Sequence, residues 1–71
     1  MVLLIGGERD GQVVDDGEMG GYEIASVPSM PGLRVAVPLS LAWRDSGKVY
    51  ARIIRWIAHC EDNALLDSLF A

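Results

Sequence analysis

Hydrophobic and polar residues alternate most regularly in the middle of the chain. Large apolar side chains occupy every odd position from Leu33 to Trp43, and small or basic residues and one proline fill the positions between them. A period of two over this length predicts a β-strand with one buried face. Pro38 has no N–H for an inner ladder, so it predicts either an edge strand or a bend that divides the strand.

The chain opens with two short apolar runs around a glycine-rich loop. Residues 2–5 and 12–15 are the predicted strands, and residues 6–11 join them. The loop contains a glycine pair and an Asp10-Gly11 pair, which tolerate the positive φ angles of tight turns. The opening therefore predicts a β-hairpin.

A third strand and a proline-containing loop follow the hairpin. Residues 16–21 are polar and glycine-rich, which predicts a turn. Residues 22–27 predict a strand that carries Tyr22 and Ile24 on one face. The segment 28–32 contains two prolines and a glycine, and it predicts a loop because proline has no amide donor for a ladder.

Residues 48–60 fit two interpretations, of which we favour the strand. The β-branched and aromatic composition of this segment, together with a short turn predicted at 45–48, is typical of a hairpin. In that register Trp43 lies opposite Val49 or Tyr50, which suits cross-strand aromatic pairing. As a helix, the segment would gather its polar residues on one stripe at spacings of three and four, and these are Lys48, Arg52, Arg55 and His59.

The last element is predicted to be a helix. Asp62 can cap it, and apolar residues follow at helical spacing over 63–70. A helix this short is marginal by itself, so we expect it to lie on the sheet. The residues expected to close the core there are Leu65, Leu66, Leu69 and Phe70. The predicted fold of the single domain, residues 1–71, is α+β: a small antiparallel sheet of four or five strands with one short C-terminal helix packed on it.

Composition limits the means by which this fold is stabilised. A chain of 71 residues buries a marginal core, and small folds compensate through disulfides, a metal or oligomerisation. One Cys and one His allow no internal disulfide and no structural zinc site. We therefore expect no metal and no cofactor, and oligomerisation stays open. Neither a signal peptide nor a membrane-spanning run is present, which predicts a soluble protein that is cytoplasmic or virion-associated.

The residues that resemble catalytic or binding motifs fit structural roles better. The glycine-rich opening lacks the spacing of both nucleotide-binding fingerprints. His59 and Cys60 look like a base beside a nucleophile, but neighbours on a strand point to opposite faces, so we expect Cys60 to fill a gap in the core. The basic residues form no dense cluster, which argues against nucleic-acid binding. We predict no enzymatic activity.

Charge is divided unevenly along the chain, whose net charge is −4. Residues 1–32 are acidic, residues 33–60 are basic and the remainder is acidic again. Opposite charges of this kind can pair between copies or neutralise each other within one monomer. The candidate interaction surface consists of Asp15, Asp16, Glu18, Glu23, Arg44, Arg52 and Arg55.

The hairpin motif also carries a resemblance. Its pattern is Leu-x-Gly-Gly-x-x-Asp-Gly-x-x-Val, found here from Leu4 to Val14, and it resembles small phage and prophage proteins of unassigned function. The resemblance implies a role in phage morphogenesis or an accessory role and carries no catalytic residue. We predict a non-enzymatic protein–protein interaction module of phage or prophage origin that self-associates or binds a larger assembly. The alternative is a small acidic inhibitor that occupies a basic groove of a host protein.

Overall fold

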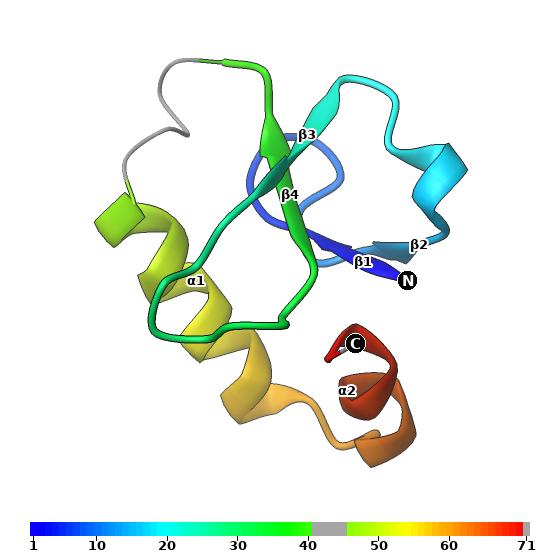
Figure 1. Cartoon of the computed structure of the whole chain (residues 1–71), viewed down its shortest axis with the longest axis vertical. Helices are drawn as coiled ribbons and strands as arrows, with labels where there is room; N and C mark the ends of the chain where they lie inside the picture. The colour runs from blue at the N-terminus through cyan, green and yellow to red at the C-terminus, as the bar shows by residue number, and fades with distance from the viewer. Residues whose placement is uncertain (41–45, 71) are drawn as a thin grey trace.

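The computed structural model describes residues 1–40 and 46–70 and shows an α+β domain with a four-stranded sheet and two helices (Figure 1). The elements in chain order are β1 (Val2–Leu4), β2 (Val13–Val14), the short 3₁₀ helix η1 (Asp16–Glu18), β3 (Tyr22–Ala25), β4 (Val35–Pro38), α1 (Ser46–His59) and α2 (Asn63–Leu69). The predicted α+β class, the strand number and the short C-terminal helix are confirmed. The other helix, α1, lies where a helix was the less favoured of two interpretations.

The sheet is mixed, with the strand order β2-β1-β4-β3. The predicted hairpin is confirmed, since β1 and β2 pair antiparallel, and β3 and β4 pair in the same way. The central pair is parallel, with Leu3 opposite Val35. The prediction that all strands are antiparallel is therefore wrong at the centre of the sheet. A parallel pair needs a long connection, and here β2, η1 and β3 supply it between β1 and β4.

Pro38 is the last residue of the inner strand β4, opposite Tyr22. Of the two expectations for Pro38, the edge strand is wrong, because β4 is an inner strand. The strand predicted from Leu33 to Trp43 ends at Pro38, where bends at Leu39 and Ser40 follow. The Pro38 nitrogen faces β1, because Ile5 N donates to Ala36 O on that side, and the paired part of β1 has already ended at Leu4. The ladder therefore loses no hydrogen bond at this proline.

Residues 48–60 belong to α1 and the turn after it, so the predicted strand is wrong here. The turn predicted at 45–48 is also wrong from Ser46 onward, because α1 begins there, and Trp43 lies outside the described residues. Val49 and Ile53 are buried, one helical turn apart, and face the sheet. Helical amphipathicity has overridden the β-propensity of the individual residues.

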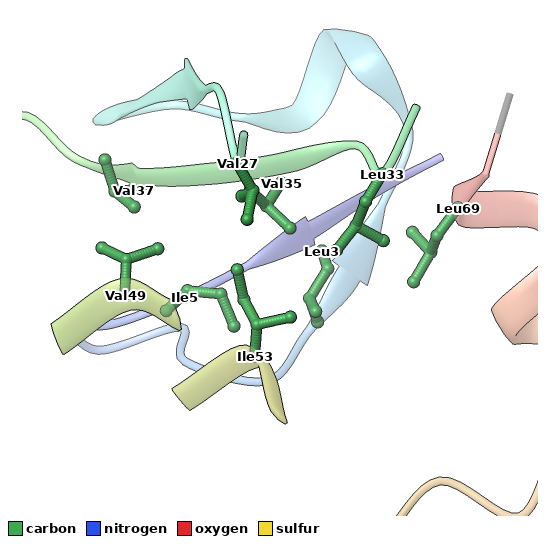
Figure 2. Packing of buried hydrophobic residues seen from close by; sticks show 9 residues of the cluster. All are labelled: Leu3, Ile5, Val27, Leu33, Val35, Val37, Val49, Ile53 and Leu69. Atoms are coloured by element: carbon green, nitrogen blue, oxygen red, sulfur yellow. The ribbon is translucent and has the colours of Figure 1, made fainter. Parts of the chain in front are cut away.

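The core on the α1 side of the sheet contains most of the buried apolar residues (Figure 2). From α1, Val49 points toward Val37, and Ile53 points toward Val35 and Leu3. The other members of the same cluster are Ile5, Val27, Leu33 and Leu69. The cluster of buried residues on the opposite face of the sheet is smaller. Its members are Val2, Leu4, Val14 and Ala36, and Met19 and Tyr22 pack against them.

The C-terminal helix α2 is capped as predicted. The Asp62 Oδ1 atom accepts a hydrogen bond from the Leu65 backbone N–H at 3.1 Å. Leu69 is fully buried beside Leu33, whereas Phe70 is 46% exposed. The expectation that four residues close the core is therefore correct for Leu69, while Leu65 and Leu66 are half-buried. Within residues 1–40 and 46–70, no helix has the length and hydrophobicity to span a membrane.

Candidate functional site

The hairpin loop is fixed by side-chain hydrogen bonds at both ends. Asp10 Oδ1 accepts from the Gly6 backbone N–H at 2.6 Å. The Tyr22 hydroxyl donates to Gly6 O at 2.6 Å and accepts from the Arg9 backbone N–H at 3.1 Å. The conspicuous residues of the opening motif thus hold the loop in place, and the loop forms one wall of a groove.

This first groove, the hairpin groove, lies between the β1–β2 hairpin and the C-terminal half of α1 and has a volume of about 670 Å³. Its apolar lining comes from Met1, Ile5, Val13, Trp56 and Leu65. Its polar lining comes from Asp10, Arg52, Arg55, His59 and Cys60. The groove lining therefore combines apolar and charged side chains.

Some polar side chains of the hairpin groove already have a hydrogen-bond or ion-pair partner within the described residues, and others do not. Arg52 Nη1 donates to Asp10 Oδ2 at 3.2 Å, so these two charges largely neutralise each other. Cys60 is half-buried, and its thiol lies 3.6 Å from Asp62 O, to which it donates. The expectation that Cys60 fills a gap in the core is therefore wrong, because Cys60 lines the hairpin groove. Arg55 and His59 are exposed on the same side of α1.

A second groove, the edge groove, follows β3 and the residues after it and has a volume of about 610 Å³. Seven consecutive residues, 23–29, line one side. Val37, Val49 and Tyr50 line the other side, from β4 and α1. Tyr50 is 42% exposed, so the edge groove presents a large apolar side chain to solvent. Ile24 is 54% exposed and borders the groove at the strand edge, and its side chain lies on the other face of the sheet because Ile24 is opposite Ala36 in the ladder.

Strand β3 is an edge strand with one unpaired side in the described part of the chain. Leu39 N donates to Gly21 O at 3.1 Å, which places Gly21, and every second residue after it, on the β4 side of the ladder. The N–H and C=O groups of Ile24 therefore point away from β4. The edge groove combines this free main-chain edge with apolar side chains.

The structure places the predicted interaction residues in three separate locations. Asp15, Asp16 and Glu18 lie at η1, Glu23 lies on β3, and Arg52 and Arg55 lie on α1, while Arg44 is outside the described residues. Asp16 is already engaged: its Oδ2 accepts from Arg34 Nη2 at 2.7 Å, and its Oδ1 is 3.9 Å from the N-terminal ammonium. The acidic residues at η1 are in this way partly neutralised within the monomer.

Of the residues that line the two grooves, Glu23, Arg52 and Arg55 were among the predicted interaction residues, whereas Ile24, Tyr50 and Trp56 were not. Tyr50 and Trp56 belong to the segment 48–60 that was favoured as a strand, and Ile24 was placed with Tyr22 on one face of the strand predicted at 22–27. The signal that would have found the first two is the helical spacing of the polar stripe in 48–60. No three His, Cys, Asp or Glu side chains come close enough to hold a metal ion among the residues described.

No protein-family model, no curated protein and no solved structure matches this chain. The resemblance of the opening motif to phage proteins therefore stays a prediction. Gly6 and Asp10 of that motif close a hairpin loop here.

Proposed function

We propose that this protein is a non-enzymatic protein–protein interaction module that self-associates by joining the free edge of β3 to the same edge of a second copy. The observation that carries the proposal is the coincidence of unpaired main-chain groups at Ile24 with the apolar edge groove. An open strand edge is a template for another strand, and the side chains beside it decide which strand binds.

The edge is suited to symmetric pairing. Residues that point their main-chain groups outward can form an antiparallel pair with their own copies around a two-fold axis. Centred on Ile24, this pairing places Ile24 opposite Ile24 of the second copy and Tyr22 opposite Ser26. The exposed Ile24 side chains then bury each other, as cross-strand apolar pairs do.

A dimer also supplies additional buried surface, which a chain of this size lacks. A domain of 71 residues buries a smaller fraction of its surface than a larger one, and within the described residues there is no disulfide or metal cluster to compensate. Pairing two four-stranded sheets would produce one continuous sheet with α1 of both copies on the same face. The uneven distribution of charge along the sequence plays no part in this contact, since the central pair is apolar.

The test is the molar mass in solution, measured by size-exclusion chromatography with light scattering at low and high protein and salt concentrations. We expect a dimer that persists in high salt, because an apolar interface is insensitive to screening. Ile24→Lys places two like charges opposite each other at the two-fold axis and should give a monomer. A wild-type monomer up to millimolar concentration would overturn the proposal.

The matched control is Leu39→Lys. Leu39 is 58% exposed, so its replacement removes a similar apolar area, but it follows β4 and does not line the edge groove. This variant should remain dimeric. The acidic-inhibitor alternative predicts the opposite pattern: a monomer under all conditions, with partner binding that weakens steeply in salt.

A further inference from the structure

We propose that the hairpin groove binds a small amphipathic carboxylate, that is, a molecule with an apolar body and one carboxylate group. This site lies apart from the edge groove, and the two share no lining residue. A volume of about 670 Å³ falls within the ~300–1,000 Å³ that small-molecule sites usually have. The groove is therefore large enough for such a ligand, and its chemistry decides which kind.

Two of the uncommitted polar groups in the hairpin groove, on Arg55 and Trp56, are donors only, and His59 can both donate and accept. The Asp10 carboxylate accepts from Gly6 N and from Arg52, so the one acidic side chain in the lining is occupied. The Arg55 guanidinium and the indole N–H of Trp56 have no partner within the described residues. Because guanidinium and indole N–H groups cannot accept, they select a ligand that supplies acceptor atoms.

Helical spacing brings these donors together. Arg52, Arg55, Trp56 and His59 follow one another at intervals of three, one and three residues, which places them on one side of α1 along the groove. After Arg52 pairs with Asp10, Arg55 contributes an uncompensated positive charge to the lining. Charge complementarity therefore favours an anion, and a planar carboxylate matches the two parallel N–H bonds of a guanidinium.

The position of the carboxylate follows from the helix itself. The last turn of α1 carries partial negative charge from its free carbonyl groups, which repels an anion at His59 and Cys60. Arg55 lies one turn earlier, so we place the carboxylate there. The apolar body then lies on Ile5, Val13 and Leu65, opposite the helix.

The proposal is tested with 4-phenylbutyrate and its neutral analogue 4-phenylbutanol, titrated against the full chain and followed by ¹H–¹⁵N NMR. The Trp43→Phe variant assigns the indole N–H signal of Trp56, which should shift on binding. We expect the carboxylate to bind at least ~10-fold more tightly than the alcohol, since a hydrogen bond to a charged group exceeds a neutral one. The preference should shrink as salt is added.

Two variants separate the site from general charge effects. Arg55→Gln should reduce the affinity for 4-phenylbutyrate to that for the alcohol. Lys48→Gln removes a cation from the same helix but outside the groove, and it should leave both affinities unchanged. Equal binding of the two probes, no saturable binding of 4-phenylbutyrate, or shifts confined to other residues would overturn the proposal. Ile24→Lys should bind the carboxylate as the wild type does, so failure of the dimer and failure of this site are distinguishable.

Discussion

The two faces of the sheet are both covered, but by different means. On the α1 face, a helix places Val49 and Ile53 against the strands and forms the larger apolar cluster (Figure 2). The opposite face is covered by Met19 and Tyr22, which come from the segment around η1 and the start of β3. There, hydrogen bonds of one tyrosine hydroxyl to the hairpin loop hold the cover in place.

The difference indicates what each face is sensitive to. The stability of the α1 face depends on buried apolar area and close packing, so it should fall when methylene groups are removed. The stability of the η1 face depends on the position of Tyr22. It should fall when the Tyr22 hydroxyl oxygen is removed or when another atom is forced against that oxygen. Substitutions can test this contrast, in each case at one fixed protein concentration, because association adds to apparent stability.

The largest effect is expected at the centre of the α1 face. Ile53 is fully buried, and Ile53→Ala should lower the free energy of unfolding by ~3–4 kcal/mol through lost burial and a residual cavity. The neighbouring Ile54 is 41% exposed, so Ile54→Ala should cost less than ~1 kcal/mol. Urea denaturation followed by circular dichroism measures both. Similar losses at the two positions would contradict the packing of α1 described here.

The second prediction addresses the η1 face through its tyrosine. Tyr22→Phe leaves Gly6 O and Arg9 N without their partner and should cost ~1–2 kcal/mol. Gly7→Ala should cost ~1–3 kcal/mol, because Gly7 has a φ of 70° and an added Cβ would lie 2.7 Å from the Tyr22 hydroxyl oxygen.

A double-mutant cycle sharpens this second prediction. Removing the hydroxyl relieves the closest contact, so Gly7→Ala should cost less in the Tyr22→Phe background than in the wild type. Strict additivity of the two losses in urea denaturation would show that the hydroxyl does not determine the cost at Gly7.

A smaller effect is expected where α2 joins the α1 face. Asp62→Ala removes the acceptor for the Leu65 N–H and should cost ~1 kcal/mol, because α2 must be helical to place Leu69 in the core. The control Asp67→Ala removes an exposed carboxylate from the same helix without affecting the cap. Thermal denaturation should separate the two variants, and equal melting temperatures would contradict the role of the cap.

The smallest effect is expected at the ion pair beside η1. Arg34 and Asp16 are joined at 2.7 Å, but their side chains are 37% and 55% exposed. Exposed pairs contribute little, so Arg34→Gln should cost ~0.5 kcal/mol or less in low salt and still less in high salt. Urea denaturation at two salt concentrations measures this. A loss as large as that of Tyr22→Phe would show that charge, and not the hydroxyl, holds the η1 face.

Local features of the fold were predictable from the sequence. The hairpin followed from glycines that adopt φ angles of 87° at Gly6 and 85° at Gly11, conformations that few other residues tolerate. The α2 cap followed from Asp62, since a side-chain acceptor before an apolar repeat is a local signal. Both signals depend on residues a few positions apart.

Features that depend on distant residues were not predictable. The parallel pairing of Leu3 with Val35 depends on which strands meet in space, and no local pattern encodes it. The contact between Tyr22 and Gly6 spans 16 residues. The hairpin groove likewise joins residues 1–13 to residues 52–65, which no local pattern brings together. In residues 48–60, β-branched residues on a helical repeat gave two local signals that conflict, and burial against the sheet selected the helix.

The parallel contact between β1 and β4 also has a consequence for folding. During synthesis, β1 leaves the ribosome well before β4 and α1, and Leu3 is fully buried only when both have arrived. Because closing long loops precedes the gain from these contacts, topology of this kind slows folding. Until then the nascent chain exposes an apolar β-strand, which is the period when it is most prone to aggregate.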